Sequence, residues 1–269
     1  MYKSLLALSF TAAIAAAPQV ATAAELDCTA GCNQVFSDAL WITVDQQSTG
    51  TGVIQSFVRI SGNTDLVDGH NSSGRPLLND ENSSPVFTRD LQIENIPILT
   101  IGGVQYYEFL LDINQNSSEP LLSLDQVEIC TGAVGGLTTA NDCPTGTVAY
   151  SLDAGTNDNI KLNYNLNSGS GSGDLFLYVP VANFAGVNPD TYVYLYSVFG
   201  ATTYLDGQGN LYGNNDGFEE WAVRLCEEID GATCTNEELP QVPEPASVML
   251  LGTGLIGLAA AVRRRRRTA

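Results

Sequence analysis

Short segments in which apolar and polar residues alternate recur along most of this 269-residue chain. Alternation at a period of two places successive side chains on opposite faces of a β-strand. The Tyr-rich segment 191–196 has the strongest β composition, because aromatic and β-branched residues favour strands. Clusters of Gly, Asn, Asp, Ser and Pro separate the segments and indicate turns. The predicted strands are 41–44, 53–60, 85–87, 104–111, 122–129, 147–150, 161–166, 175–179, 191–196 and 218–223.

This pattern predicts an all-β fold, with an antiparallel β-sandwich or jelly-roll-like body. The Gly/Ser run 168–173 fits a domain linker or a hairpin loop, and we favour a hairpin loop within one domain. The predicted organisation is a signal peptide at 1–24, the β-sandwich body at 25–226, an acidic linker at 227–242 and a C-terminal segment at 243–269.

The N-terminus has the three regions of a secretory signal peptide. Lys3 supplies a positive charge, an apolar stretch follows, and Ala21-Thr22-Ala23 is typical of a cleavage site. We therefore expect export through the Sec translocon and cleavage by signal peptidase near Ala23 or Ala24.

The exported part is strongly acidic. Of 11 basic residues, Lys3 and five arginines near the C-terminus lie in the terminal segments, which leaves five against 30 acidic residues, a formal charge of −25. Such a charge repels phosphate backbones, so we expect no nucleic-acid partner. It attracts divalent cations, and calcium is the one that carboxylate and amide oxygens bind outside the cytoplasm.

An even number of cysteines in an exported chain indicates disulfides. Six cysteines allow fifteen connectivities, and pairing between sequence neighbours is the simplest of these. The candidates are Cys28, Cys32, Cys130, Cys143, Cys226 and Cys234.

The C-terminal segment has three parts in a fixed order. Pro243, Glu244 and Pro245 precede the uncharged stretch 246–262, and five arginines follow it. As a helix this stretch spans about 26 Å, close to the bilayer core of about 30 Å. The arginine cluster favours a cytoplasmic end and an outward-facing body. The arginines are Arg263, Arg264, Arg265, Arg266 and Arg267.

These three parts together resemble the PEP-CTERM sorting signal. The resemblance implies processing by an exosortase in a Gram-negative bacterium, with transient anchoring in the inner membrane. It further implies transfer to the cell surface or extracellular matrix, in an exopolysaccharide or biofilm context. An uncut, permanently anchored protein is the alternative. Segments 173–180 and 214–221 are similar to stretches in other PEP-CTERM bodies, whose function is largely unassigned.

The sequence offers few candidates for catalysis. His70 is the single histidine and lies in a segment of loop composition, where we expect it to be solvated. A glycoside hydrolase needs only two carboxylates, and Glu219 and Glu220 lie beside Trp221, a conceivable sugar platform. Neighbours on a strand point to opposite faces, however, so these two cannot form the pair together. We assign no catalytic residue, and a hydrolase remains the lowest-ranked alternative.

Calcium is the one cofactor that the sequence suggests. Asp206, Asn210 and Asp216 lie in a glycine-rich segment with many oxygen ligands, although it lacks the EF-hand pattern. Segments 112–116 and 153–158 are similar in kind. The same residues also form ordinary turns, and both interpretations stay open.

The predicted function is a structural or adhesive, non-enzymatic surface protein. The alternative is a calcium-dependent carbohydrate-binding module, with Trp41 or Trp221 and loop acids forming its site. Asn71, Asn82 and Asn116 head Asn-x-Ser sequences, which we expect in surface loops.

Overall fold

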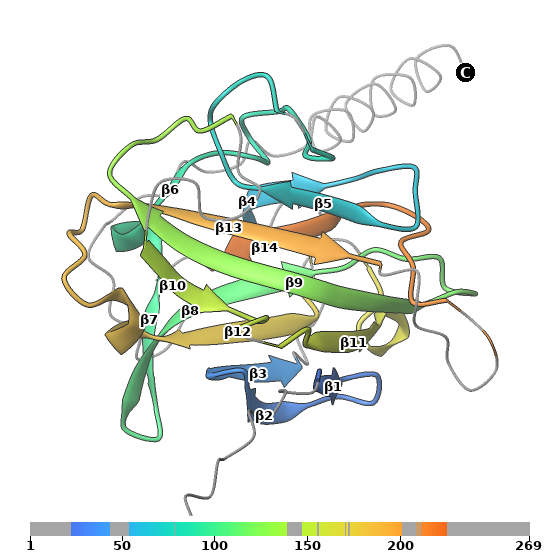
Figure 1. Cartoon of the computed structure of the whole chain (residues 1–269). Coiled ribbons are helices and arrows are strands. Elements are labelled where there is room, and N and C mark those ends of the chain that lie inside the picture. Colours follow the sequence, from blue (N-terminus) through green and yellow to red (C-terminus); the bar gives the residue numbers. More distant parts are fainter. Residues whose placement is uncertain are drawn as a thin grey trace, which may run out of the picture.

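The computed structural model describes residues 23–224, except 44–53, 78, 139–146, 155, 170, 172, 201–208 and 210. These residues form fourteen β-strands in two seven-stranded sheets, with three short 3-10 helices and no α-helix (Figure 1). The prediction of a mainly β body with two sheets is confirmed. No helix in the described ranges is long and apolar enough to cross a membrane. Most of the predicted signal peptide, the linker and the C-terminal segment lie outside those ranges.

The first sheet, sheet A, has the strand order β1-β11-β9-β13-β5, with β10 also paired to β9 and β6 to β13. The β1–β11 pair is parallel and the others are antiparallel, so the expected antiparallel arrangement has one exception. The strands are β1 (Glu25–Asp27), β5 (Val67–His70), β6 (Leu91–Gln92), β9 (Leu121–Gly132), β10 (Thr147–Ser151), β11 (Asn159–Asn163) and β13 (Tyr192–Phe199).

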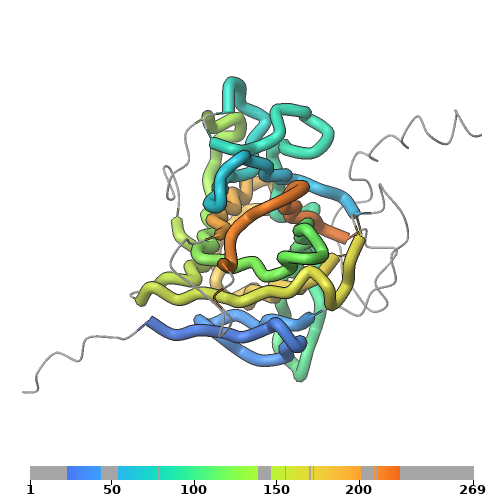
Figure 2. Tube along the Cα trace, turned by 90° about the vertical axis from the view of Figure 1, so that its right-hand side faces the viewer, coloured from blue at the N-terminus to red at the C-terminus, as the bar shows by residue number. Residues whose placement is uncertain are grey.

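The second sheet, sheet B, is antiparallel, with the order β2-β3-β12-β8-β14-β4 and β7 paired to β8. Its strands are β2 (Asn33–Phe36), β3 (Ala39–Thr43), β4 (Gln55–Ile60), β7 (Ile98–Ile101), β8 (Val104–Asp112), β12 (Leu175–Pro180) and β14 (Glu219–Val223). In the view of Figure 2, the N-terminal strands lie at the bottom of the body and the segment around β5 lies at the top.

The core lies between the sheets and follows the alternation of the strands. On β12, Leu175, Leu177 and Val179 belong to the main core cluster. Phe176 and Tyr178, on the opposite face, belong to a second cluster on sheet B. Burial of each such side chain stabilises the fold by about 1.5–3 kcal/mol, so the period-two pattern specifies which face of β12 meets sheet A.

Two local predictions are wrong. Residues 85–87 form a turn, in which the Phe87 and Thr88 amides both donate to the Ser84 carbonyl oxygen. The 168–173 loop connects β11 in sheet A to β12 in sheet B through the 3-10 helix Tyr164–Leu166, so it crosses between the sheets and is no hairpin loop. Asn163 begins that helix, because its side chain accepts a hydrogen bond from the Asn165 amide.

Candidate functional site

A polar groove lies between two loops at the end of sheet B. Loop 61–65 forms one wall and loop 214–217 the other, around a volume of about 460 Å³. A neighbouring hollow of about 270 Å³ shares Asp65, Asn214 and Asn215, and adds Glu119 and the exposed Leu211. We call residues 61–65 and 214–217 the polar groove. Amides, hydroxyls and carboxylates dominate its walls.

Hydrogen bonds hold the two walls together. The Asn214 amide donates to the Asp65 carbonyl oxygen at 2.7 Å. The Asn214 side chain donates to the Thr64 carbonyl oxygen at 3.0 Å, and the Ser61 hydroxyl donates to that of Gly217 at 2.9 Å. The groove is therefore a fixed part of the fold.

Segment 112–116 lies next to the groove and connects it to the end of β8. The Asn215 amide donates to Oε1 of Gln115 at 3.2 Å, and the Asn116 amide donates to Oδ1 of Asn215 at 2.8 Å. The Asn114 side chain donates to the Phe218 carbonyl oxygen at 3.2 Å. We call residues 112–116, 171, 173, 174 and 214–219 the loop junction.

Two buried aspartates lie at this junction. The Gly171 and Gly173 amides donate to the carboxylate of Asp112 at 2.7 and 3.3 Å, and the Ile113 amide donates to Oδ2 of Asp174 at 2.7 Å. Oδ1 of Asp174 is buried and has no hydrogen-bond partner. Burial, together with the nearby charge of Asp112, raises the pKa of Asp174 well above its ordinary value.

Glu219 is the third buried carboxylate of the junction. It has no exposure to solvent, and it accepts from the Asn114 amide at 3.0 Å and from the Gln115 side chain at 3.1 Å. Burial is the main cause that raises the pKa of Glu219, and the charges of Asp174 and Asp112 add to it. The three acidic groups therefore lie close enough together for the charges of Asp112 and Asp174 to favour the protonated form of Glu219.

Two further buried glutamates on sheet B each have an arginine partner. Arg59 donates to Oε1 of Glu220 at 2.6 Å, and its guanidinium lies 3.5 Å from the ring centre of Phe87. Arg224 donates to both oxygens of Glu108, at 2.6 and 2.5 Å. The two glutamates are neutralised locally, whereas no described arginine or lysine forms an ion pair with Asp174 or Glu219.

Of the predicted calcium ligands, only Asp216 is described. It is exposed, lines the polar groove, and its Oδ1 accepts a hydrogen bond from the Gly217 amide. Asp206 and Asn210 lie outside the described residues. Within the described part of the chain, no three His, Cys, Asp or Glu side chains form a group that could hold a metal ion.

Neither tryptophan can serve as a sugar platform, so that part of the carbohydrate-binding hypothesis is wrong. Trp41 and Trp221 have no exposure and belong to the core between the sheets. Trp221 donates from Nε1 to the Ser197 hydroxyl at 3.0 Å. Glu219 and Glu220, which lie beside Trp221 in the sequence, are 0% and 2% exposed and so are closed to a substrate as well.

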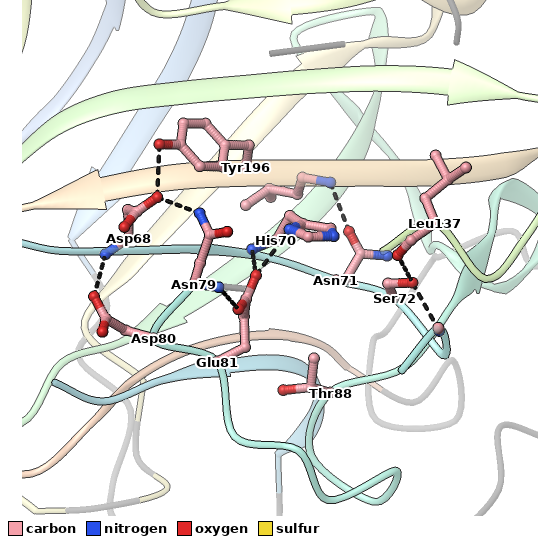
Figure 3. A network of polar contacts seen from close by, with 12 residues as sticks. Asp68, His70, Asn71, Ser72, Asn79, Asp80, Glu81, Thr88, Leu137 and Tyr196 are labelled. Carbon is pink, nitrogen blue, oxygen red and sulfur yellow. Dashed lines mark hydrogen bonds and ion pairs between the residues drawn. The ribbon is translucent and has the colours of Figure 1, made fainter. Parts of the chain in front are cut away.

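The expectation of a solvated His70 is also wrong. His70 ends strand β5, is completely buried, and its Nδ1 lies 2.8 Å from Oε1 of Glu81 (Figure 3). A catalytic role requires contact with a substrate, which this burial prevents. Asn71, predicted in a surface loop, is buried as well and bonds the β13 backbone at Val193 and Leu195.

The described part of the chain contains one complete disulfide, between Cys28 and Cys32. Cys130 is also disulfide-bonded. Cys143, Cys226 and Cys234 lie outside the described residues.

The destination of the protein follows from its C-terminal part. The family described as a PEP-CTERM protein-sorting motif matches residues 241–266. The chain carries a PEP-CTERM sorting motif. The motif implies an exported protein that an exosortase processes, as PEP-CTERM proteins are sorted to the cell surface of Gram-negative bacteria. No curated protein and no solved structure matches the chain.

The structure also brings together segments 173–180 and 214–221, which the sequence analysis singled out. Segment 173–180 begins at the loop junction with Gly173 and Asp174, and segment 214–221 supplies one wall of the polar groove and Glu219. Sequence reasoning found both segments and 112–116, but it did not place them at one site.

Proposed function

We propose that this PEP-CTERM protein is a structural or adhesive component of the cell surface or exopolysaccharide matrix and has no enzymatic activity. The sorting motif at 241–266 carries this proposal, because it directs the body to that location. The acidic, disulfide-containing two-sheet body suits a surface protein exposed to the exterior.

The burial of His70 and of three acidic side chains supports a non-enzymatic role. A hydrolase needs an acid and a second carboxylate at the substrate, whereas Asp112, Glu219, Glu220 and His70 are at most 2% exposed. Their hydrogen bonds and ion contacts go to neighbouring parts of the fold.

Carbohydrate binding is the second candidate function, and the polar groove favours it. Asn, Ser and Thr side chains suit the hydroxyl groups of a sugar, because they both donate and accept hydrogen bonds, and the Asp carboxylates accept them. The acidic charge of the body favours a neutral polysaccharide over an anionic one.

Deletion of the gene for this protein in its host tests the structural role. We expect less exopolysaccharide on the cell surface and weaker cell cohesion, both restored by the wild-type chain. The Asn215→Ala variant alters the groove. If this variant restores cohesion and polysaccharide retention, the structural role needs no sugar contact in the groove. If the wild-type chain restores them and Asn215→Ala does not, the result supports carbohydrate binding. Normal cohesion and polysaccharide retention in the deletion strain contradict the proposal.

A further inference from the structure

The loop junction brings three acidic side chains into the interior of the protein, Asp112, Asp174 and Glu219. Five carboxylates are buried along sheet B and its loops, of which Arg59 and Arg224 pair with two. An ionised carboxylate that is buried without a counter-charge costs several kcal/mol. The set comprises Glu108, Asp112, Asp174, Glu219 and Glu220.

The end of the β8–β12 pair brings two of these carboxylates close together. Leu175 of β12 pairs with Leu111 of β8, and the Asp174 amide also donates to the Leu111 carbonyl oxygen at 2.7 Å. Because the Ile113 amide donates to Oδ2 of Asp174, the Asp174 carboxylate lies beside the end of β8, where Asp112 is the last residue. Backbone amides fix Asp112 and one oxygen of Asp174, while Oδ1 of Asp174 has no protein donor. Asp174 is only 7% exposed, so that oxygen is an unused acceptor inside the cluster.

We propose that Asp112 and Asp174 bind a divalent cation, which outside the cell is Ca²⁺. A calcium site needs no third acidic side chain, since Ca²⁺ also takes carbonyl, amide and water oxygens. Glu219 is a third acidic side chain beside the site, because the charges of Asp174 and Asp112 both act on it. The site differs from the predicted one, which used Asp206, Asn210 and Asp216.

A cation at this position would stabilise the loops around the polar groove. Asp112 bonds the 171–173 loop, and Asn114 contacts both Glu219 and the Phe218 carbonyl oxygen of the groove-forming segment. Gly217 lies so close to Asn114 that an added Cβ would come within 2.6 Å of its side chain. Calcium binding to the aspartates therefore couples directly to the shape of the groove.

Metal titration of the full chain in detergent tests this proposal. Tb³⁺ reports the site, because Trp221 pairs in register with Leu111, the neighbour of Asp112, and can sensitise its luminescence. We expect saturable Tb³⁺ luminescence that Ca²⁺ displaces, and at least tenfold weaker binding in Asp174→Asn. Asp216→Asn is the matched control and should bind as the wild type does.

A thermal melt with and without calcium keeps the test valid if a variant folds poorly. Calcium should raise the Tm of the wild type and of Asp216→Asn but not that of Asp174→Asn. In chelator, Asp174→Asn should be at least as stable as the wild type, because it removes a buried charge. Wild-type affinity in Asp174→Asn overturns the proposal. So does an absence of calcium binding to the wild type, in which case a proton shared by the two aspartates accounts for the unpartnered oxygen.

Discussion

Oε1 of Glu81 lies 2.8 Å from Nδ1 of His70, and neither side chain has any exposure to solvent. The same oxygen accepts the His70 amide at 2.8 Å, and the other oxygen of Glu81 accepts the Asn79 amide at 3.2 Å. This contact attaches the 79–81 segment to β5, as Figure 3 shows.

Glu81→Ala should therefore destabilise the body. The substitution leaves the His70 and Asn79 amides without their acceptor and removes the carboxylate beside the buried His70 ring, which costs about 3 kcal/mol in the free energy of unfolding. Urea denaturation measures this, with Asp190→Ala at an exposed position as the control. A loss below about 1 kcal/mol would show that the contact contributes little.

Arg224 should be replaceable by lysine only in part. Arg224 holds both oxygens of the buried Glu108, to which the Tyr178 hydroxyl also donates at 3.0 Å. Lysine cannot form this two-bond contact, so we expect Arg224→Lys to cost about 1–2 kcal/mol and Arg224→Ala about 3 kcal/mol. A double-mutant cycle with Glu108→Gln measures the coupling energy between Arg224 and Glu108. If the losses of stability in the two single variants simply add in the double variant, the two side chains are not coupled and the prediction is contradicted.

Asp153 should make the stability of the body depend on pH. Burial raises its pKa to about 6, and the charges of Asp158, Asp125 and Glu128 contribute. The folded-state pKa of Asp153 lies above the unfolded value of about 3.9. The contribution of protonated Asp153 to the free energy of unfolding is therefore fully present below about pH 4. It is lost as the pH rises through about 6.

Asp153→Asn should remove the loss of stability at high pH, because asparagine has no charge. The asparagine side-chain oxygen can still accept the hydrogen bond from the Asp158 amide. Since Asp153 is partly exposed, we expect a gain of about 1 kcal/mol at pH 8 and none at pH 4. Chemical denaturation at both pH values measures it, with Asp190→Asn as the control. An equal change in the free energy of unfolding at pH 4 and pH 8 would exclude the ionisation of Asp153 as its cause.

The disulfide should stabilise the N-terminal strands. Cys28 follows β1 of sheet A and Cys32 precedes β2 of sheet B, so the bond joins segments of both sheets. We expect Cys28→Ser with Cys32→Ser to cost about 2 kcal/mol. Denaturation of the wild type and of this variant measures the cost, and an unchanged midpoint would contradict it.

Prediction from the sequence succeeded for strands in which apolar and polar residues alternate clearly between the two faces. Strands β8, β9 and β12 combine alternation with aromatic and aliphatic residues, and all three lie where expected. Strand β5 was missed, because Val67-Asp68-Gly69-His70 has the composition of a turn. Its stability depends on distant partners, since Tyr196 donates to Asp68 and Glu81 contacts His70.

The candidate site was predictable only in pieces. Segments 112–116 and 206–216 stood out for their oxygen-bearing side chains, but nothing local shows that Asp112, Asp174 and Glu219 meet. Their meeting depends on the pairing of β8 with β12 and β14. Correct pairing of the predicted strands 104–111 and 175–179 would have placed the two aspartates near each other at the end of that pair.

Intact mass spectrometry of the chain recovered from the host's surface tests whether an exosortase sorts this protein. We expect a mass that lacks the signal peptide and the segment after Pro243-Glu244-Pro245, and loss of that species in a strain without the exosortase. A surface-recovered chain that still contains Arg263 to Arg267, or an unchanged mass without the exosortase, would contradict it.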